Sequence, residues 1–166
     1  MKFKLHLYGR IAAAAAILVL AGAGFLSAQD KGFGAGVIIG EPTGLGAKLW
    51  LSRDIALDFA AAWSLYRNDD EGKNDEGAFY VHADYLHHFF GAITVQSGRL
   101  VPYIGLGGKA AFSEDLYMGV RFPLGLTYMF RKAPVDIFVE ISPSLIIFPG
   151  TAFDAGAGIG ARYWFK

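Results

Sequence analysis

The stretch from residue 135 to residue 148 reads VDIFVEISPSLIIF. Its odd-numbered positions are all apolar, from Val135 through Pro143 to Ile147. Its even-numbered positions hold the polar side chains, which are Asp136, Glu140, Ser142 and Ser144. Because side chains alternate between the two faces of a β-strand, this period of two predicts a strand with one apolar and one polar face. The stretch is also longer than the roughly 9–11 residues that a strand needs to cross a bilayer.

The same alternation recurs along most of the chain, and turn-forming residues such as Pro149-Gly150-Thr151 separate one alternating stretch from the next. Only two connections are longer, at 67–77 and 91–99. We therefore expect an all-β fold, an eight-stranded antiparallel up-and-down β-barrel. The predicted strands are 33–40, 44–52, 55–66, 79–90, 101–112, 116–130, 135–148 and 153–165.

Charged residues lie on only one of the two faces of these predicted strands. All those well inside a strand share its less apolar face, namely Lys48, Asp58, Asp84, Lys109, Arg121, Asp136, Glu140, Asp154 and Arg162. The same face is rich in small residues, which suit the crowded interior of an eight-stranded barrel. We therefore predict a transmembrane barrel with the apolar face toward lipid and an ion-pair network inside. A soluble lipocalin-like carrier, with the apolar face inward, is the alternative.

Further polar residues on the predicted inner face are Tyr80, His82 and Ser142. A buried charge needs a partner, so the inner face predicts a salt-bridge plug, with a gated ion path or proton relay as the alternative. His82 and Asp84 lie on one face and could form a hydrolase triad with Ser64 or Ser142, but no G-x-S-x-G motif is present. We predict no enzyme activity, no cofactor and no metal site.

The first 28 residues are typical of a cleaved secretory signal. Lys2, Lys4 and Arg10 form a basic start, an apolar stretch follows to Leu26, and Ser27-Ala28 offers a cleavage site. The predicted domains are thus a signal peptide over 1–28 and a barrel over 29–166. The chain has 15 basic and 15 acidic residues and no cysteine, which excludes a disulfide scaffold and gives no basic surface for nucleic acid.

The signal, the amphipathic strands and the aromatic last strand together resemble the small bacterial outer-membrane barrels of the OmpX and OmpA-transmembrane kind, and also the short-loop barrels of spirochaetes. Within the last strand, Gly160, Tyr163 and Phe165 are similar to the terminal signal that the barrel-assembly machinery reads in that family. The resemblance implies a monomer in the bacterial outer membrane, in contact with its lipid, with both termini in the periplasm.

In that orientation the acidic connection 67–77 is extracellular, with its acids at Asp69, Asp70, Glu71, Asp75 and Glu76. No extracellular ligand is indicated by these residues. We expect a structural or surface-interaction role for the barrel. The alternatives are a small gated pore, a lipid-modifying outer-membrane enzyme and the soluble carrier.

Overall fold

The computed structural model describes residues 32–64, 78–113 and 116–165 of the 166-residue chain. The predicted signal peptide over 1–28 and the acids of the connection 67–77 lie outside these residues. Gly32–Lys166 forms one compact unit in which every described element is a β-strand. No helix of the described residues is long and apolar enough to cross a membrane.

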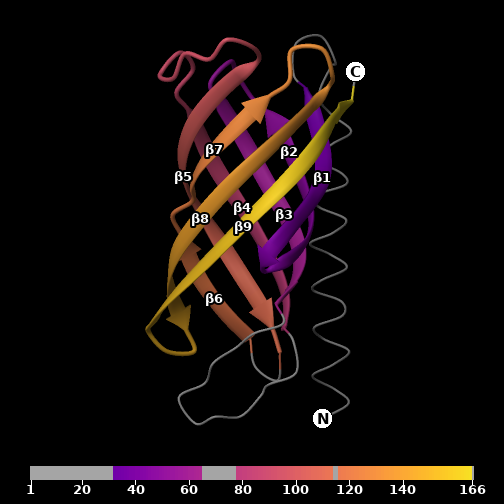
Figure 1. Cartoon of the computed structure of the whole chain (residues 1–166). Coiled ribbons are helices and arrows are strands. Elements are labelled where there is room, and N and C mark those ends of the chain that lie inside the picture. Colours follow the sequence, from indigo (N-terminus) through magenta and orange to yellow (C-terminus); the bar gives the residue numbers. More distant parts are fainter. Residues whose placement is uncertain (1–31, 65–77, 114–115, 166) are drawn as a thin grey trace. The chain divides into compact units, whose positions relative to one another are not determined.

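The described residues form nine strands that follow one another along the chain (Figure 1). Their bounds agree with the predicted ranges to within a few residues. They are β1 (Phe33–Glu41), β2 (Thr43–Trp50), β3 (Ile55–Ser64), β4 (Ala78–His88), β5 (Arg99–Phe112), β6 (Leu116–Arg121), β7 (Leu124–Met129), β8 (Val135–Phe148) and β9 (Ala152–Phe165).

The strands pair into one closed antiparallel ring. Except for β6 and β7, strands that follow one another in the chain pair with each other, and β1 pairs with β9, which closes the ring. β6 and β7 both lie between β5 and β8, so together they occupy one position of the ring. The ring therefore has the predicted eight positions, and the eight-stranded antiparallel barrel fold is confirmed.

The interruption between β6 and β7 falls at Phe122 and Pro123, inside the predicted strand 116–130. Proline has no N–H for the ladder, so strand pairing stops there. The backbone nevertheless stays bonded on both sides, because Phe122 N donates to Pro143 O at 2.9 Å and Gly105 N donates to Pro123 O at 2.8 Å. The ring thus closes across the proline without a gap in its hydrogen bonding.

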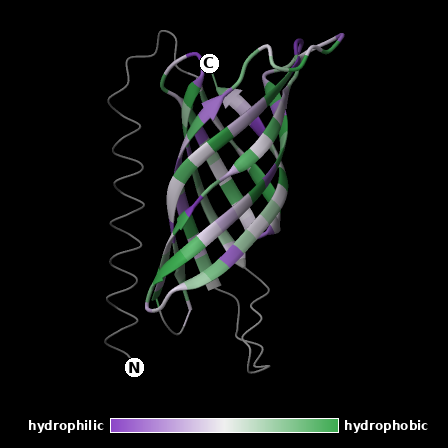
Figure 2. Cartoon of the chain, turned by 90° about the vertical axis from the view of Figure 1, so that its left-hand side faces the viewer, coloured by the Kyte–Doolittle hydropathy of each residue, from purple (hydrophilic) through white to green (hydrophobic). Residues whose placement is uncertain are grey.

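Alternation along each strand divides an inner face from an outer face, and Figure 2 shows hydrophobic and polar segments alternating along the ribbon. In β3, for example, Ala56, Asp58 and Ala60 are buried, whereas Trp63 on the other face is 51% exposed. Many large apolar side chains are exposed, and the most exposed of them come from several strands: Ile39, Leu45, Leu106, Ile141, Ile147 and Phe153. Most large apolar side chains thus face outward, and the inner face holds mainly small or polar ones together with a few buried apolar ones such as Leu86, Val101 and Phe138.

The two ends of the ring are defined by the register of β1 and β9. Phe33 pairs with Phe165, so the first and last described strands begin and finish at one end, which we call the termini end. The turn after β2 and the turn after β7 lie at this end too. The turns that join β1 to β2 and β8 to β9 lie at the other end, which we call the distal end.

Gly107 in β5 faces inward at a point where two neighbours leave no room for a side chain. A Cβ built there would lie 1.8 Å from Asp84 Oδ1 and 2.4 Å from Ala83 O. Gly108, the next residue, faces outward, and its Cβ would meet nothing closer than 4.0 Å. The two positions differ in face and share one strand.

We therefore expect Gly107→Ala to lower the free energy of unfolding by about 1–3 kcal/mol, because the added methyl group overpacks the interior. Gly108→Ala is the matched control and should leave stability nearly unchanged. Urea unfolding of both variants in detergent measures the difference. Equal midpoints for the two would contradict the assignment of faces in β5.

Candidate functional site

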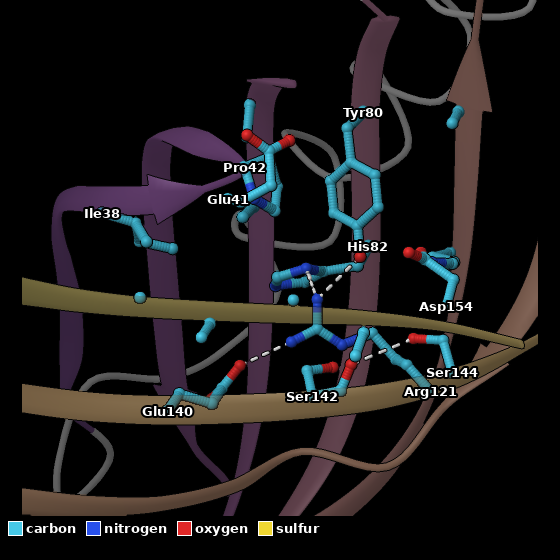
Figure 3. Close-up of a pocket in the computed structure, with 18 of the residues that line it drawn as sticks. Ile38, Glu41, Pro42, Tyr80, His82, Arg121, Glu140, Ser142, Ser144 and Asp154 are labelled. Carbon is cyan, nitrogen blue, oxygen red and sulfur yellow. Dashed lines mark hydrogen bonds and ion pairs between the residues drawn. The ribbon is translucent and has the colours of Figure 1, made fainter. Parts of the chain in front are cut away.

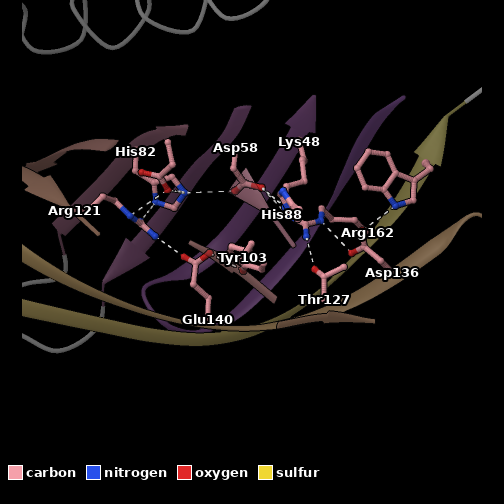
Figure 4. A network of polar contacts seen from close by, with 12 residues as sticks. Lys48, Asp58, His82, His88, Tyr103, Arg121, Thr127, Asp136, Glu140 and Arg162 are labelled. Carbon is pink, nitrogen blue, oxygen red and sulfur yellow. Dashed lines mark hydrogen bonds and ion pairs between the residues drawn. The ribbon is translucent and has the colours of Figure 1, made fainter. Parts of the chain in front are cut away.

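The inner face of the ring holds a connected set of charged side chains (Figure 4). At its centre is Arg162 of β9, which is 3% exposed. Its Nη1 donates to Asp58 Oδ1 of β3 at 2.7 Å, and its Nε donates to Asp136 Oδ1 of β8 at 3.1 Å. Its Nη2 lies 3.4 Å from Thr127 Oγ1 of β7. One guanidinium group thereby joins strands from opposite sides of the ring.

Lys48 of β2 lies beside this arginine, toward the termini end. Its Nζ is 3.7 Å from Asp58 Oδ1 and 3.0 Å from Nε2 of His88, and it lies 4.7 Å from the centre of the Tyr103 ring. Because a lysine ammonium can only donate, His88 Nε2 must accept, which places the proton of a neutral imidazole on Nδ1. His88 therefore serves as an inward-facing partner of the lysine.

Aromatic rings fill the space between Lys48 and the termini end. The Trp50 ring lies 4.4 Å from the His88 ring and 6.1 Å from the Trp164 ring, measured between centroids. Trp164 Nε1 also donates to Asp136 Oδ2 at 2.9 Å. These rings form a dense polar and aromatic layer together with Lys48, Arg162 and their acidic partners Asp58 and Asp136. We call this layer the inner plug.

A second cluster surrounds Arg121 at the end of β6, which is 3% exposed. Its Nη2 donates to Glu140 Oε1 at 2.5 Å, and its Nε lies 3.2 Å from Asp84 Oδ2. Nη1 donates to Tyr80 OH at 2.9 Å and also contacts Nδ1 of His82. A guanidinium offers only donors, so His82 Nδ1 accepts and a neutral ring has its proton on Nε2.

Two contacts connect the Arg121 cluster with the inner plug. Tyr103 OH donates to Glu140 Oε2 at 2.8 Å, while the same ring contacts Lys48. His82 Nε2 lies between two carboxylates, 3.9 Å from Asp58 Oδ2 and 3.7 Å from Asp84 Oδ2. The carboxylates in these contacts each have a basic partner elsewhere, which is Arg162 for Asp58 and Arg121 for both Asp84 and Glu140. These ion pairs offset the cost of removing each charge from water.

The last charged pair lies nearer the distal end. Lys109 of β5 is bonded to Asp154 of β9, and its Nζ lies 5.7 Å from the centre of the Tyr80 ring. The Lys109 side chain is 5% exposed, whereas that of Asp154 is 52% exposed. Asp154, predicted as an interior residue, thus lies at the solvent-accessible rim of the ring.

A pocket of about 650 Å³ occupies the ring interior between the Arg121 cluster and the distal end (Figure 3). Its floor includes Arg121, His82 and Glu140, and Ser142 and Ser144 of β8 line it as well. Asp154 lies at its rim. Small residues of β3 and β9, among them Ala60, Ala62, Gly156 and Gly158, form part of the wall and leave the space open, and larger side chains such as Ile38, Phe138 and Ile146 line the rest.

The structure brings the nine predicted interior charges into these groups, and Tyr80 and His82 join them through Arg121. Ser142 Oγ is buried and has no hydrogen-bond partner among the described residues. Of the three residues predicted as an assembly signal, Gly160 is buried, and Tyr163 and Phe165 are half exposed on the outer face. Their recognition by assembly machinery stays a prediction.

Sequence analysis missed His88, Tyr103 and Trp164 as members of the network. His88 shares the even-numbered face of Tyr80, His82 and Asp84, and Tyr103 shares the odd-numbered face of Lys109, so the period of two already contained the signal. Their partners come from distant strands. Lys48 is 40 residues away from His88 in sequence, and Glu140 is 37 residues away from Tyr103.

The geometry of the described side chains, which do not include that of Ser64, gives no hydrolase triad of His82 with Ser142. His82 Nδ1 is engaged by Arg121, and no bond joins His82 to Ser142 Oγ, although a nucleophile and its base should lie within hydrogen-bond reach. Among the described residues no group of three or more histidine and acidic side chains is placed to hold a metal ion.

Comparisons with known proteins concern the fold. The structure is similar to the N-terminal β-barrel domain of Pseudomonas aeruginosa OprF, with a TM-score of 0.57 and 16% identity over 81% of this chain and 96% of that chain. It also matches Neisserial surface protein A (NspA), with a TM-score of 0.47 and 14% identity over the same shares. No family model and no curated protein matches. The resemblance to small barrels is thus confirmed as a likeness of fold.

Removal of Arg121 should be far more damaging than removal of an exposed charge. Arg121→Ala leaves Asp84 and Glu140 buried without their partner, and breaking a buried ion pair in this way costs about 3–5 kcal/mol. Arg99→Ala, at an exposed position of β5, should cost less than about 1 kcal/mol. Unfolding midpoints of the two variants in urea give the comparison. Equal midpoints would show that the Arg121 contacts contribute nothing to stability.

Proposed function

We propose that the chain is an integral protein of the bacterial outer membrane, with a structural or surface-interaction role and an interior closed by ion pairs. The observation that supports this most directly is the distribution of side chains around the ring. Large apolar side chains cover its outer face, while the charged side chains inside the strands point inward. Such a surface is unfavourable in water and favourable in lipid.

Aromatic side chains at both ends of the outer face support the same proposal. At the termini end the ring centroids of Phe33 and Phe165 lie 5.9 Å apart, and those of Tyr128 and Phe130 lie 4.9 Å apart. At the distal end Trp63 and Phe79 are 5.9 Å apart, and Phe112 extends this group. Two aromatic girdles of this kind mark the interfaces of a membrane barrel.

A soluble carrier would need the opposite arrangement. Its apolar face would line an internal cavity, and its charges would lie in water. Here the interior contains Arg121, Arg162 and their acidic partners, and the pocket floor is polar. We therefore favour the membrane barrel over the lipocalin-like alternative.

The proposed orientation has both termini in the periplasm. The first and last strands reach the same end of the ring, as Phe33 and Phe165 show. The predicted signal peptide implies export, and the family that the sequence resembles has its termini in the periplasm. In this orientation the distal end and its pocket face outside the cell.

The interior contacts favour a closed barrel over a pore. Near the termini end, the contacts of the inner plug, including that of Arg162 with Asp58, span the interior. Nearer the distal end, Arg121 spans it through its bond to Glu140. A pore would need these layers to separate. The small gated pore stays the alternative function, because the pocket already opens part of the interior.

Val139→Arg tests the membrane location. Val139 is 48% exposed on the outer face of β8, so an arginine there would face lipid at a cost of about 2–4 kcal/mol near the midplane. Ala133→Arg, in the exposed turn before β8, is the control. Refolding into lipid vesicles, measured by the change in gel mobility on heating, should fall for Val139→Arg only. Equal insertion of both variants would refute a lipid-facing β8.

The closed interior predicts the absence of conductance. Refolded mature protein in a planar bilayer should give no reproducible channel steps, because two charged layers block the interior. Gel mobility and circular dichroism of the same sample verify that it is folded. Stable steps from such a sample would instead support the gated pore, with Arg121 and Glu140 as the first residues to test as its gate.

A further inference from the structure

The pocket at the distal end has the size and the lining of a small-molecule site. Its volume of about 650 Å³ falls within the roughly 300–1,000 Å³ of known ligand pockets. The charged contacts of Arg121 form its floor, and Asp154 lies at its rim with half of its side chain exposed to solvent. A solute that enters at the distal end therefore meets buried polar groups.

We propose that this pocket binds small organic cations, meaning amines and quaternary ammonium compounds, and excludes anions of similar size. The proposal goes beyond the membrane role, because it concerns the interior of the folded ring and can be measured in detergent. It rests on the charge balance of the lining residues and on the partners that each lining base already has.

Acidic groups outnumber basic groups around the pocket. Inside the ring its lining contains the two bases Lys109 and Arg121, against the three acids Asp58, Glu140 and Asp154. The charges just behind the lining do not alter this excess, since the two bases Lys48 and Arg162 are balanced by the two acids Asp84 and Asp136. The lining inside the ring therefore has a formal charge of −1, and a net negative charge in a narrow cleft favours cations over anions.

Both bases of the lining already have acidic partners. Lys109 is bonded to Asp154, and Arg121 contacts Glu140 and Asp84 in addition to Tyr80. An incoming anion would have to displace a carboxylate from one of these bases. The partly exposed carboxylate of Asp154, in contrast, can accept a second cationic group without breaking its bond to Lys109.

Ser142 is an independent sign of a site for a polar ligand. Its side chain lines the pocket and is buried, with only 5% of the residue exposed, yet its hydroxyl has no hydrogen-bond partner among the described residues. A buried hydroxyl without a partner is costly, and a polar ligand that reaches it removes that cost. It can accept a hydrogen bond from the N–H of a protonated amine, whereas a quaternary ammonium ion has no N–H and would be held by its charge alone.

The chain has no cysteine, so single-cysteine variants report on the pocket directly. Ser142→Cys places a thiol in the pocket with little change in size. Thr151→Cys, in the exposed turn of the same end, measures reactivity outside the pocket, and Thr127→Cys, at a fully buried position, measures reactivity behind it. Each variant is folded in detergent and treated with a cationic trimethylammonium or an anionic sulfonate methanethiosulfonate reagent.

For Ser142→Cys we expect the cationic reagent to react faster by on the order of ten-fold, relative to the same ratio at Thr151→Cys. Thr127→Cys should react with neither reagent. In the Ser142→Cys background, Asp154→Asn should lower the preference and Lys109→Gln should raise it. Tetramethylammonium should slow the cationic modification, whereas sodium chloride at equal ionic strength should slow it less.

Three results would overturn the proposal. They are a cation preference at Ser142→Cys no greater than that at Thr151→Cys, faster reaction with the sulfonate reagent, and no protection by tetramethylammonium beyond that of sodium. A shift in gel mobility on heating verifies folding of every variant, so loss of structure cannot imitate these results. The thiol reactions are measured in detergent without a bilayer. Their result therefore does not depend on whether the Val139→Arg experiment supports the membrane location.

Discussion

The Arg162 guanidinium is the contact on which the interior of the ring depends. It donates to Asp58 on one side and to Asp136 on the other, and these residues lie 104 and 26 positions away in the chain. A charge in so narrow a space is stable only when it is paired and hydrogen-bonded. Lys48 places a second positive charge beside Asp58, and Trp164 donates a further hydrogen bond to Asp136.

This constraint explains the unusual division of residue types between the two faces. Because the interior of an eight-stranded ring is only wide enough to be filled by side chains, long charged residues must alternate there with small ones. Gly107 makes room for Asp84, and Gly125 makes room for the Tyr103 ring, whose Cζ would lie 2.2 Å from an added Cβ. The apolar volume that a soluble protein would bury is placed on the outer face instead.

The interior is not filled uniformly, and this affects what the barrel can do. Toward the termini end the inner plug combines ion pairs with the rings of Trp50, Trp164 and Tyr103. Toward the distal end, alanines and glycines of β3 and β9 leave the pocket open above Arg121. Polar side chains thus have two consequences in the same ring: they close it at one end, and they give an accessible acidic surface at the other.

Sequence alone determined the strands, their faces and the residues that point inward, because the period of two is a local property of an extended chain. It predicted the range 135–148 to the residue and placed Arg162 and Asp58 on the inner face. It could not predict that these two bond to each other, since the partners across a ring depend on strand register and closure. It also could not predict the open pocket or the exposed position of Asp154, because these follow from how far each strand extends past its neighbours. The tertiary structure decided them through the geometry of ring closure, which brings distant strands within hydrogen-bond reach.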